Sequence, residues 1–302
     1  MNSVVGLCKA MRPRQWVKNL LVFLPLLFAV DLVWSPTELM TLLAYAPRLA
    51  ALFAAFCALS SAVYIINDLV DREADRQHPT KRFRPIASGD VSPALAWAAF
   101  AALVVAGMVG LYAISAPPYR ALAVIGAVYL LVNVAYSLRL KRVALVDVML
   151  VAAGYVMRAV AGAVAVGATP SPWLYAVTAA GALFIVIGRR YAEARLAGPD
   201  PDAQRPTLQH YGPPVGGQLL VLSATAALVS YTLYAVEADN LPDNNTMLLT
   251  VPLVIFGLFR YLYLLNHSRD AESPEILMLR DVPLLLSIAA WVVVAGGVLV
   301  LN

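Results

Sequence analysis

One asparagine and three aspartates lie close together in the string NDLVDREADRQHPTKRFRPIASG, at Asn67, Asp68, Asp71 and Asp75. If one helix runs through this string, Asn67, Asp71 and Asp75 are spaced i, i+4, i+8 and share a face. Carboxylates this close repel one another unless a cation lies among them, and Mg²⁺ is normally held by one or two carboxylates together with phosphate oxygens. The spacing therefore predicts a magnesium-diphosphate site. Its metal ligands are all four residues, and its catalytic residues are the three aspartates.

Basic residues follow the acids directly, at Lys81, Arg82 and Arg84. Their cationic groups suit the phosphate oxygens that a metal ion leaves uncovered, so one segment carries groups for both the metal and the phosphates. In the alternative interpretation the acids form solvated ion pairs with Arg72 and Arg76, and the basic run only marks the cytoplasmic side of a membrane protein.

The elements that position these residues are predicted to be membrane helices. Of the 302 residues, 61% are hydrophobic and only 13% are charged, whereas about a quarter of the residues of a soluble domain are charged. Apolar stretches of membrane-spanning length recur along the whole chain. They are Trp16–Val33, Leu49–Ile66, Pro93–Ser115, Tyr119–Leu138, Ala144–Val166, Trp173–Ile187, Leu219–Val236, Met247–Leu265 and Val282–Leu301. We predict an all-α integral membrane protein with about nine transmembrane helices in a single domain over residues 1–302.

The basic residues orient the helices in the membrane. Most of the 22 lysines and arginines fall on one side if the N-terminus is cytoplasmic, which predicts the N-terminus inside and the C-terminus outside. The two longer loops, at about 67–92 and 188–216, then face the cytoplasm, where connections of this length more often carry function than short turns do. Because topology accounts for the basic residues, the net charge of +4 does not indicate a nucleic-acid partner.

A few polar residues lie within or at the ends of the predicted spans. Arg158 shares a helix face with Asp147 and Tyr155, and a charge at membrane depth usually faces a polar cavity or pairs with another helix. Both alternatives remain open here. Lys18 and Asn19, at the mouth of the first span, suit either a lipid phosphate or anchoring at the membrane interface.

The acidic string resembles a known motif. NDLVDREADRQ is similar to the first aspartate-rich motif, NDxxDxxxD, of the UbiA-type intramembrane prenyltransferases, and RPIASG is similar to the segment that follows it there. The resemblance covers essentially the whole chain. It implies a nine-helix bundle around a central cavity open to the cytoplasm, and Mg²⁺-dependent binding of a diphosphate by the acids named above.

The chain departs from the prenyltransferases after the sixth span. They carry a second aspartate-rich motif there, whereas this chain reads GRRYAEARLAGPDPD, in which Arg189, Arg190 and Arg195 outnumber the nearby Glu193. Cations at this point suit a further phosphate group. With the strings MRPRQWVKNLLVFLPLLF and YSLRLKR, this loop resembles the decaprenyl-phosphate phosphoribosyltransferase branch of the superfamily, which serves bacteria that build arabinan cell walls.

That resemblance implies a phosphoribosyl diphosphate donor, a decaprenyl phosphate acceptor and a site on the cytoplasmic face of the bacterial plasma membrane. The substrate-binding residues are then expected to be Lys18, Asn19, Lys81, Arg82, Arg84, Tyr136, Arg139, Lys141, Tyr155, Arg158, Arg189, Arg190, Tyr191 and Glu193. The oligomeric state stays open, and a homo-oligomer within the membrane lipid is compatible with the sequence.

Two other functions compete with this reading. A prenyltransferase that moves a polyprenyl group from its diphosphate to an aromatic or lipid acceptor would want carboxylates after the sixth span, where this chain has mostly arginines. A transporter would use buried charges such as Arg158 to line its pathway, but that does not account for an acidic motif confined to one side of the membrane.

Overall fold

The computed structural model describes residues 3–30, 33–35, 38–116, 120–168, 172–196, 207–238, 241, 244–268 and 274–301. Within these ranges every regular segment is helical, and the only β-type pairing is an isolated bridge between Val30 and Trp34. The predicted all-α class is therefore confirmed for the described part of the chain.

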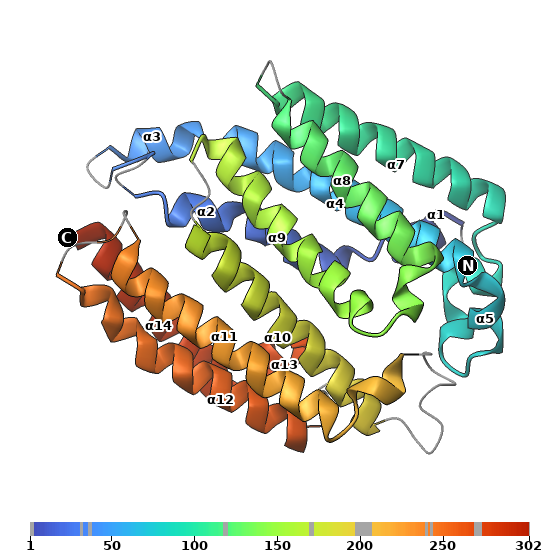
Figure 1. Cartoon of the computed structure of the whole chain (residues 1–302). Helices are drawn as coiled ribbons and strands as arrows, with labels where there is room; N and C mark the ends of the chain where they lie inside the picture. The colour runs from blue at the N-terminus through green and yellow to red at the C-terminus, as the bar shows by residue number, and fades with distance from the viewer. Residues whose placement is uncertain are drawn as a thin grey trace. The chain divides into compact units, whose positions relative to one another are not determined.

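The helices follow one another as Figure 1 shows, and shorter 3₁₀ segments, labelled η, connect several of them. In chain order they are α1 (Ser3–Ala10), η1 (Pro13–Phe23), α2 (Leu24–Leu27), α3 (Leu39–Ala44), α4 (Ala46–Val70), α5 (Arg72–Gln77), η2 (Lys81–Phe83), α6 (Pro85–Ser88), α7 (Pro93–Ile114), α8 (Ala121–Leu138), η3 (Leu140–Arg142), α9 (Val146–Val166), α10 (Pro172–Leu196), η5 (Leu208–Tyr211), α11 (Val215–Glu237), η6 (Thr246–Thr250), α12 (Val251–His267), α13 (Pro274–Arg280) and α14 (Val282–Leu301).

Seven helical segments among the described residues are long and apolar enough to cross a membrane. They are Met40–Val70, Pro93–Ile114, Ala121–Leu138, Val146–Val166, Val215–Glu237, Thr246–His267 and Val282–Leu301. Large apolar side chains such as Val105 and Leu131 are 61% and 72% exposed, as is expected of helices that face lipid. The chain is therefore a multi-pass membrane protein, while the count of nine spans, the central cavity and the orientation of the termini stay predictions.

The first expected span, Trp16–Val33, differs from the prediction. Its described residues do not form one α-helix, because η1 has 3₁₀ geometry up to Phe23 and α2 then continues only to Leu27. Pro25 has no backbone N–H and its ring clashes with a preceding carbonyl in an α-helix, which favours the tighter 3₁₀ pattern before it. The sixth expected span, Trp173–Ile187, lies within α10.

The chain divides into two compact units, which we describe separately; the single domain over residues 1–302 stays a prediction. Unit 1 comprises Met1–Leu27, Leu39–Leu150 and Met157–Thr169, and unit 2 comprises Phe28–Glu38, Val151–Val156 and Pro170–Asn302. In unit 1, α4 lies along α7 and α8 (Figure 1). Gly107 permits this approach, because a Cβ atom there would lie only 2.5 Å from Leu59 Cδ2.

A small apolar cluster in unit 1 holds the end of α4 beside the segment that follows it. Ala10, Ile65, Ile86, Val91 and Ala96 are all essentially buried and pack together. These residues come from α1, α4, α6, the turn after α6 and α7. Their packing fixes where the string RPIASG lies relative to the acidic motif.

In unit 2, α11 lies along α10, and α12 lies along α14. A polar group in the apolar interior joins α11, η6 and α14. The Tyr231 hydroxyl lies 2.5 Å from Thr250 Oγ1, and Trp291 Nε1 donates to the same hydroxyl at 2.7 Å. Each polar atom therefore has a partner, as burial requires.

Replacing Gly162 with alanine is expected to destabilise unit 1. A Cβ atom at this position of α9 would lie 2.2 Å from the carbonyl oxygen of Val22, so η1 would have to move. Such overpacking costs about 1–3 kcal/mol, which exceeds the gain of up to about 1 kcal/mol that alanine brings to a helix. We expect a lower melting temperature in detergent. Gly110→Ala is the control, because its new Cβ atom meets only Ala55 Cβ at 3.6 Å. Equal melting temperatures for the two variants would contradict the close contact.

Candidate active site

The acidic motif spans the junction of α4 and α5. The first of these helices, α4, ends at Val70, and the next residue, Asp71, has φ −88° and ψ 1°. The backbone nevertheless continues its i→i+4 hydrogen bonding, since Asp71 N–H donates to the carbonyl of Asn67 at 3.0 Å and Asp75 N–H donates to that of Asp71 at 2.8 Å. The four side chains therefore project from an almost continuous helical path. We call Asn67, Asp68, Asp71 and Asp75 the acid cluster.

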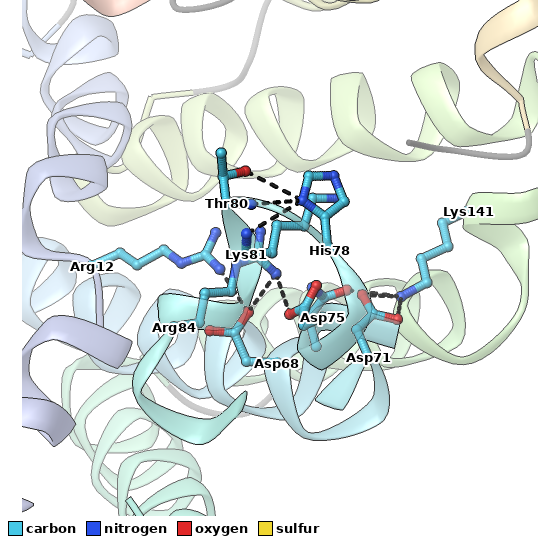
Figure 2. A network of polar contacts seen from close by, with 10 residues as sticks. Arg12, Asp68, Asp71, Asp75, His78, Thr80, Lys81, Arg84 and Lys141 are labelled. Atoms are coloured by element: carbon cyan, nitrogen blue, oxygen red, sulfur yellow. Dashed lines mark hydrogen bonds and ion pairs between the residues drawn. The ribbon is translucent and has the colours of Figure 1, made fainter. Parts of the chain in front are cut away.

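Lys141 binds one half of the acid cluster. Its ammonium donates to both carboxylate oxygens of Asp71, at 2.5 and 2.7 Å, and to Asn67 Oδ1 at 3.2 Å. Lys141 was expected to bind substrate, and it comes from η3 after α8, 70 residues away in the sequence. Tertiary packing thus brings the string YSLRLKR against the acidic motif (Figure 2).

Arg84 binds the other half of the acid cluster. Its Nη1 atom donates to Asp75 Oδ2 at 2.7 Å and to Asp68 Oδ1 at 3.2 Å. The prediction that Asp75 shares a face with Asn67 and Asp71 is therefore only partly right, because Asp75 shares its partner Arg84 with Asp68. Seven residues are about 20° from two full turns, whereas eight residues are about 80° from them.

Arg12 also reaches the acid cluster, and sequence reasoning missed it as a site residue. Its Nη2 atom donates to Asp68 Oδ1 at 2.6 Å, and its guanidinium lies 4.8 Å from the centre of the Tyr64 ring. The only signal in the sequence was its place in the string MRPRQW, where it is one of several basic residues that favour a cytoplasmic N-terminus. Its partner lies 56 residues along the chain, and no local pattern predicts such a pair.

The basic run after the acids divides by role. Arg84 contacts the acid cluster, while Arg82 is exposed and lies over the ring of Phe83 at 4.8 Å. The alternative partners of the acids find other contacts: Arg72 and Arg76 both pair with Glu73, at 3.8 and 3.1 Å. The acid cluster is thus not a set of ion pairs with these two arginines.

His78 shapes the turn between the acids and the basic run. Its Nδ1 atom accepts hydrogen bonds from the backbone N–H groups of Thr80, at 3.2 Å, and Lys81, at 3.3 Å. Partial burial lowers the pKa of the His78 imidazole, and the nearby positive charge of Lys81 lowers it further. A neutral ring suits an accepting nitrogen at this position.

The donors of the acid cluster suit a hard divalent ion, since they are carboxylate and amide oxygens of the kind Mg²⁺ prefers. Among the residues that the structure describes, no three His, Cys, Asp or Glu side chains converge in a metal-binding arrangement. Instead the oxygens accept hydrogen bonds from Arg12, Arg84 and Lys141. The chemistry of the donor set fits magnesium, and these cations occupy its oxygens here.

Arg158 lies inside unit 1 at the centre of a second polar network. Its Nε atom donates to Asn19 Oδ1 at 2.7 Å, and its Nη2 atom donates to the Tyr129 hydroxyl at 2.8 Å. Asn19 is fully buried and also donates to Cys57 Sγ at 3.2 Å. These contacts match the alternative in which Arg158 pairs with polar groups of other segments, while its role toward substrate stays a prediction.

The other predicted site residues lie in several places. Lys18 is half-buried in η1 beside Asn19. Tyr136 lies in the last turn of α8, and Arg139 follows that helix directly. Half-buried Tyr155 lies on α9. Their substrate contacts stay predictions.

The last turns of α10 supply a separate group in unit 2, because the helix continues to Leu196 where the sequence predicted a loop from about residue 188. Glu193 pairs with Arg189 at 2.9 Å and with Arg190 at 2.8 Å, and the Tyr191 hydroxyl donates to Asn266 Oδ1 at 2.9 Å. Residues 197–206 of the expected loop lie outside the described residues. Glu193, the acid among these arginines, therefore forms ion pairs with two of them.

The amino-acid sequence is similar to a known protein family and to named relatives. The sequence pattern described as the UbiA prenyltransferase family matches residues 22–288. The decaprenyl-phosphate phosphoribosyltransferase of Mycobacterium tuberculosis H37Rv is 37% identical over 298 residues, which is 98% of this chain and 95% of the relative. The enzyme of the same name from Mycolicibacterium smegmatis is 38% identical over 307 residues, covering 98% and 93%.

A solved structure has the same fold. A UbiA homologue from Archaeoglobus fulgidus bound to GPP and Mg²⁺ superposes with a TM-score of 0.69 at 19% identity, over 97% of this chain and 99% of that one. At 19% identity this similarity establishes the fold and does not establish the activity.

Proposed function

This chain belongs to the UbiA prenyltransferase family, and we propose that it transfers 5-phosphoribose from phosphoribosyl diphosphate to decaprenyl phosphate. The products are decaprenylphosphoryl-5-phosphoribose and diphosphate, and the lipid product serves cell-wall arabinan synthesis. The observation that carries the proposal is the similarity, along nearly the whole chain, to relatives that bear the name of this activity.

The acid cluster and its cations suit the donor. Asn67, Asp68, Asp71 and Asp75 would hold Mg²⁺, which when bound neutralises the charge that develops on the leaving diphosphate. Arg84 and Lys141 are already placed beside these oxygens, and each can donate hydrogen bonds to phosphate. Lys81, Arg82, Arg189 and Arg190 complete the proposed set of phosphate-binding cations.

The acceptor needs little activation. A phosphate monoester is already an anion at neutral pH, so no strong general base is required. One phosphate oxygen forms a bond to ribose C1, the bond from C1 to the diphosphate oxygen breaks, and the diphosphate leaves with the electron pair. Attack from the opposite side predicts inversion at C1. Holding the two substrates in line should supply much of the rate, and we assign Lys18, Asn19, Tyr136, Arg139, Tyr155, Arg158, Tyr191 and Glu193 to this positioning.

The orientation of the site is part of the proposal. We propose that the acid cluster faces the cytoplasm at the bacterial plasma membrane, and the basic residues around it support this through the positive-inside rule. A phosphorylated sugar donor is soluble there, and the lipid phosphate enters from the bilayer.

Product formation tests the proposed function directly. Purified protein with Mg²⁺, labelled phosphoribosyl diphosphate and decaprenyl phosphate should yield a labelled lipid, which mass spectrometry identifies as decaprenylphosphoryl-5-phosphoribose. Decaprenol without its phosphate should yield none, because the attacking oxygen is missing, and chelation of the metal should stop the reaction. A protein that ignores phosphoribosyl diphosphate but prenylates an aromatic acid from a polyprenyl diphosphate would overturn the proposal in favour of the prenyltransferase. Solute flux in proteoliposomes without transfer would favour the transporter.

A further inference from the structure

Three cationic side chains from separate segments bind the acid cluster. Arg12 precedes η1, Arg84 precedes α6 and Lys141 lies in η3. Figure 2 shows Arg12 and Lys141 reaching the acids from opposite sides, with Arg84 beside Asp68 and Asp75. We call these three residues the counter-ions. Their three positive charges match the three negative charges of the aspartates.

The ion pairs between the counter-ions and the aspartates are largely buried. The side chains of Asp68 and Asp75 are only 2% and 5% exposed, and that of Lys141 is 11% exposed. Water therefore screens these charges less than it screens pairs on the surface. Any ion that enters the cluster meets counter-ions already bound to Asp68 Oδ1, Asp75 Oδ2 and both carboxylate oxygens of Asp71.

A divalent metal ion alone competes poorly. It must displace N–H donors from the carboxylates, and the displaced cations remain tethered nearby, where they repel it. A diphosphate removes this penalty, because its anionic oxygens can accept the hydrogen bonds of the displaced guanidinium and ammonium groups. The metal and the diphosphate should therefore assist each other's binding.

We propose that Arg12, Arg84 and Lys141 are exchangeable counter-ions that make the binding of divalent metal and of diphosphate mutually dependent. The inference rests on the proposed function, since it concerns the same site. It adds Arg12 as a diphosphate-binding residue, and it predicts an order of events in which the metal enters together with the donor. Because binding couplings are reciprocal, each ligand must strengthen the other by the same factor.

Arg12 is held in place by more than its ion pair. Its backbone has φ 53° and ψ 61°, a left-handed conformation that non-glycine residues adopt rarely and that persists only where surrounding contacts impose it. The adjoining η1 is fixed to α9, because Asn19 bonds Arg158 and Gly162 contacts Val22. The Arg12 side chain itself is 30% exposed, so it can exchange partners while its backbone stays in position.

Titration with Mn²⁺ alone tests the first half of the proposal. Mn²⁺ is a spectroscopic probe for the site, and its binding to purified protein in detergent can be followed by electron paramagnetic resonance without any phosphate. Lys141→Met should bind Mn²⁺ roughly tenfold more tightly than wild type, within the range typical of coupled sites. Arg142→Met is the matched control: it removes the same charge one residue away, from an exposed side chain, and should bind like wild type.

Titration with the preformed Mn²⁺-diphosphate complex tests the second half. Lys141→Met should bind this complex more weakly than wild type, opposite to its effect on Mn²⁺ alone. Arg12→Met should shift both affinities in the same directions as Lys141→Met, and exposed Arg14 supplies its control as Arg14→Met. Arg12→Met also keeps the test decisive if Lys141→Met does not fold.

Unchanged Mn²⁺ affinity in Lys141→Met and Arg12→Met, or the same increase in their controls, would overturn the inference. So would tighter Mn²⁺ binding without weaker binding of the complex, since the cations would then be structural only. These outcomes are independent of the transfer assay. Suppose that the wild-type protein fails to transfer phosphoribose while the variants bind Mn²⁺ more tightly and the Mn²⁺-diphosphate complex more weakly. That result would refute the proposed function and still support the counter-ion inference.

Discussion

Asp75→Asn and Asp71→Asn should each lower the rate of phosphoribosyl transfer on the order of 10²–10³-fold, the usual cost of removing one preorganised charge from a site that stabilises a leaving group. Asparagine keeps the shape of the side chain but removes the charge that we propose binds metal. Asp75 is buried and Asp71 is half-buried, so water cannot replace the lost carboxylate well. The rate of labelled lipid formation measures the effect, and raised Mg²⁺ should recover part of it if the lost group binds metal.

Glu73→Gln is the control for both variants. Glu73 lies on α5 between the two aspartates, its side chain is 72% exposed, and it pairs with Arg76. Surface pairs of this kind contribute little, so the variant should transfer phosphoribose at nearly the wild-type rate. If Asp71→Asn and Asp75→Asn also kept that rate while remaining folded, the acid cluster would not be the active site.

Arg158→Met should produce the largest loss of stability among the single substitutions considered. The change leaves the buried Asn19 side chain and the Tyr129 hydroxyl without the donors that now lie at 2.7 and 2.8 Å. Hydrogen bonds to charged groups contribute about 1.5–3 kcal/mol each, and the relief of no longer burying a charge offsets part of this. We expect a net loss of about 2–4 kcal/mol, seen as a lower melting temperature in detergent.

Two comparisons make the Arg158 result interpretable. Arg158→Lys should lose less than Arg158→Met, because an ammonium keeps the charge but cannot span both acceptors as the planar guanidinium does. Arg14→Met, at an exposed arginine before η1, should melt like wild type. If Arg158→Met melted at the wild-type temperature, the polar network would not hold η1 against α9, and a direct role of Arg158 toward substrate would gain support.

Local spacing explains which site residues were found from the sequence. The acids and Arg84 lie within one short string, so helical periodicity and charge were enough to predict that they act together. Periodicity alone did not predict which acids pair. Asp75 shares Arg84 with Asp68, because the seven residues between their positions are nearly two whole turns of the almost continuous helical path through Asp71.

Long-range partners could not be found in this way. Arg12 and Lys141 reach the acid cluster from 56 and 70 residues away, and each was one of many basic residues with the same local character. Lys141 was identified only through the string YSLRLKR, and Arg12 was counted as a topology signal. For Arg158 the sequence indicated only that a charge at membrane depth faces a polar cavity or pairs with another helix. The packing of the folded chain makes Asn19 and Tyr129 its partners.

The sequence by itself determined that this protein is an all-helical, multi-pass membrane protein and that its acidic motif is of the UbiA type, because hydropathy and local spacing are properties of short segments. Only the tertiary structure decided that η1 is a 3₁₀ segment packed against α9, and that two distant cations, Arg12 and Lys141, join Arg84 in neutralising the acids. The physical reason is that charges buried in an apolar unit must find partners wherever packing brings them. That packing is the joint result of many contacts, and no single segment specifies it.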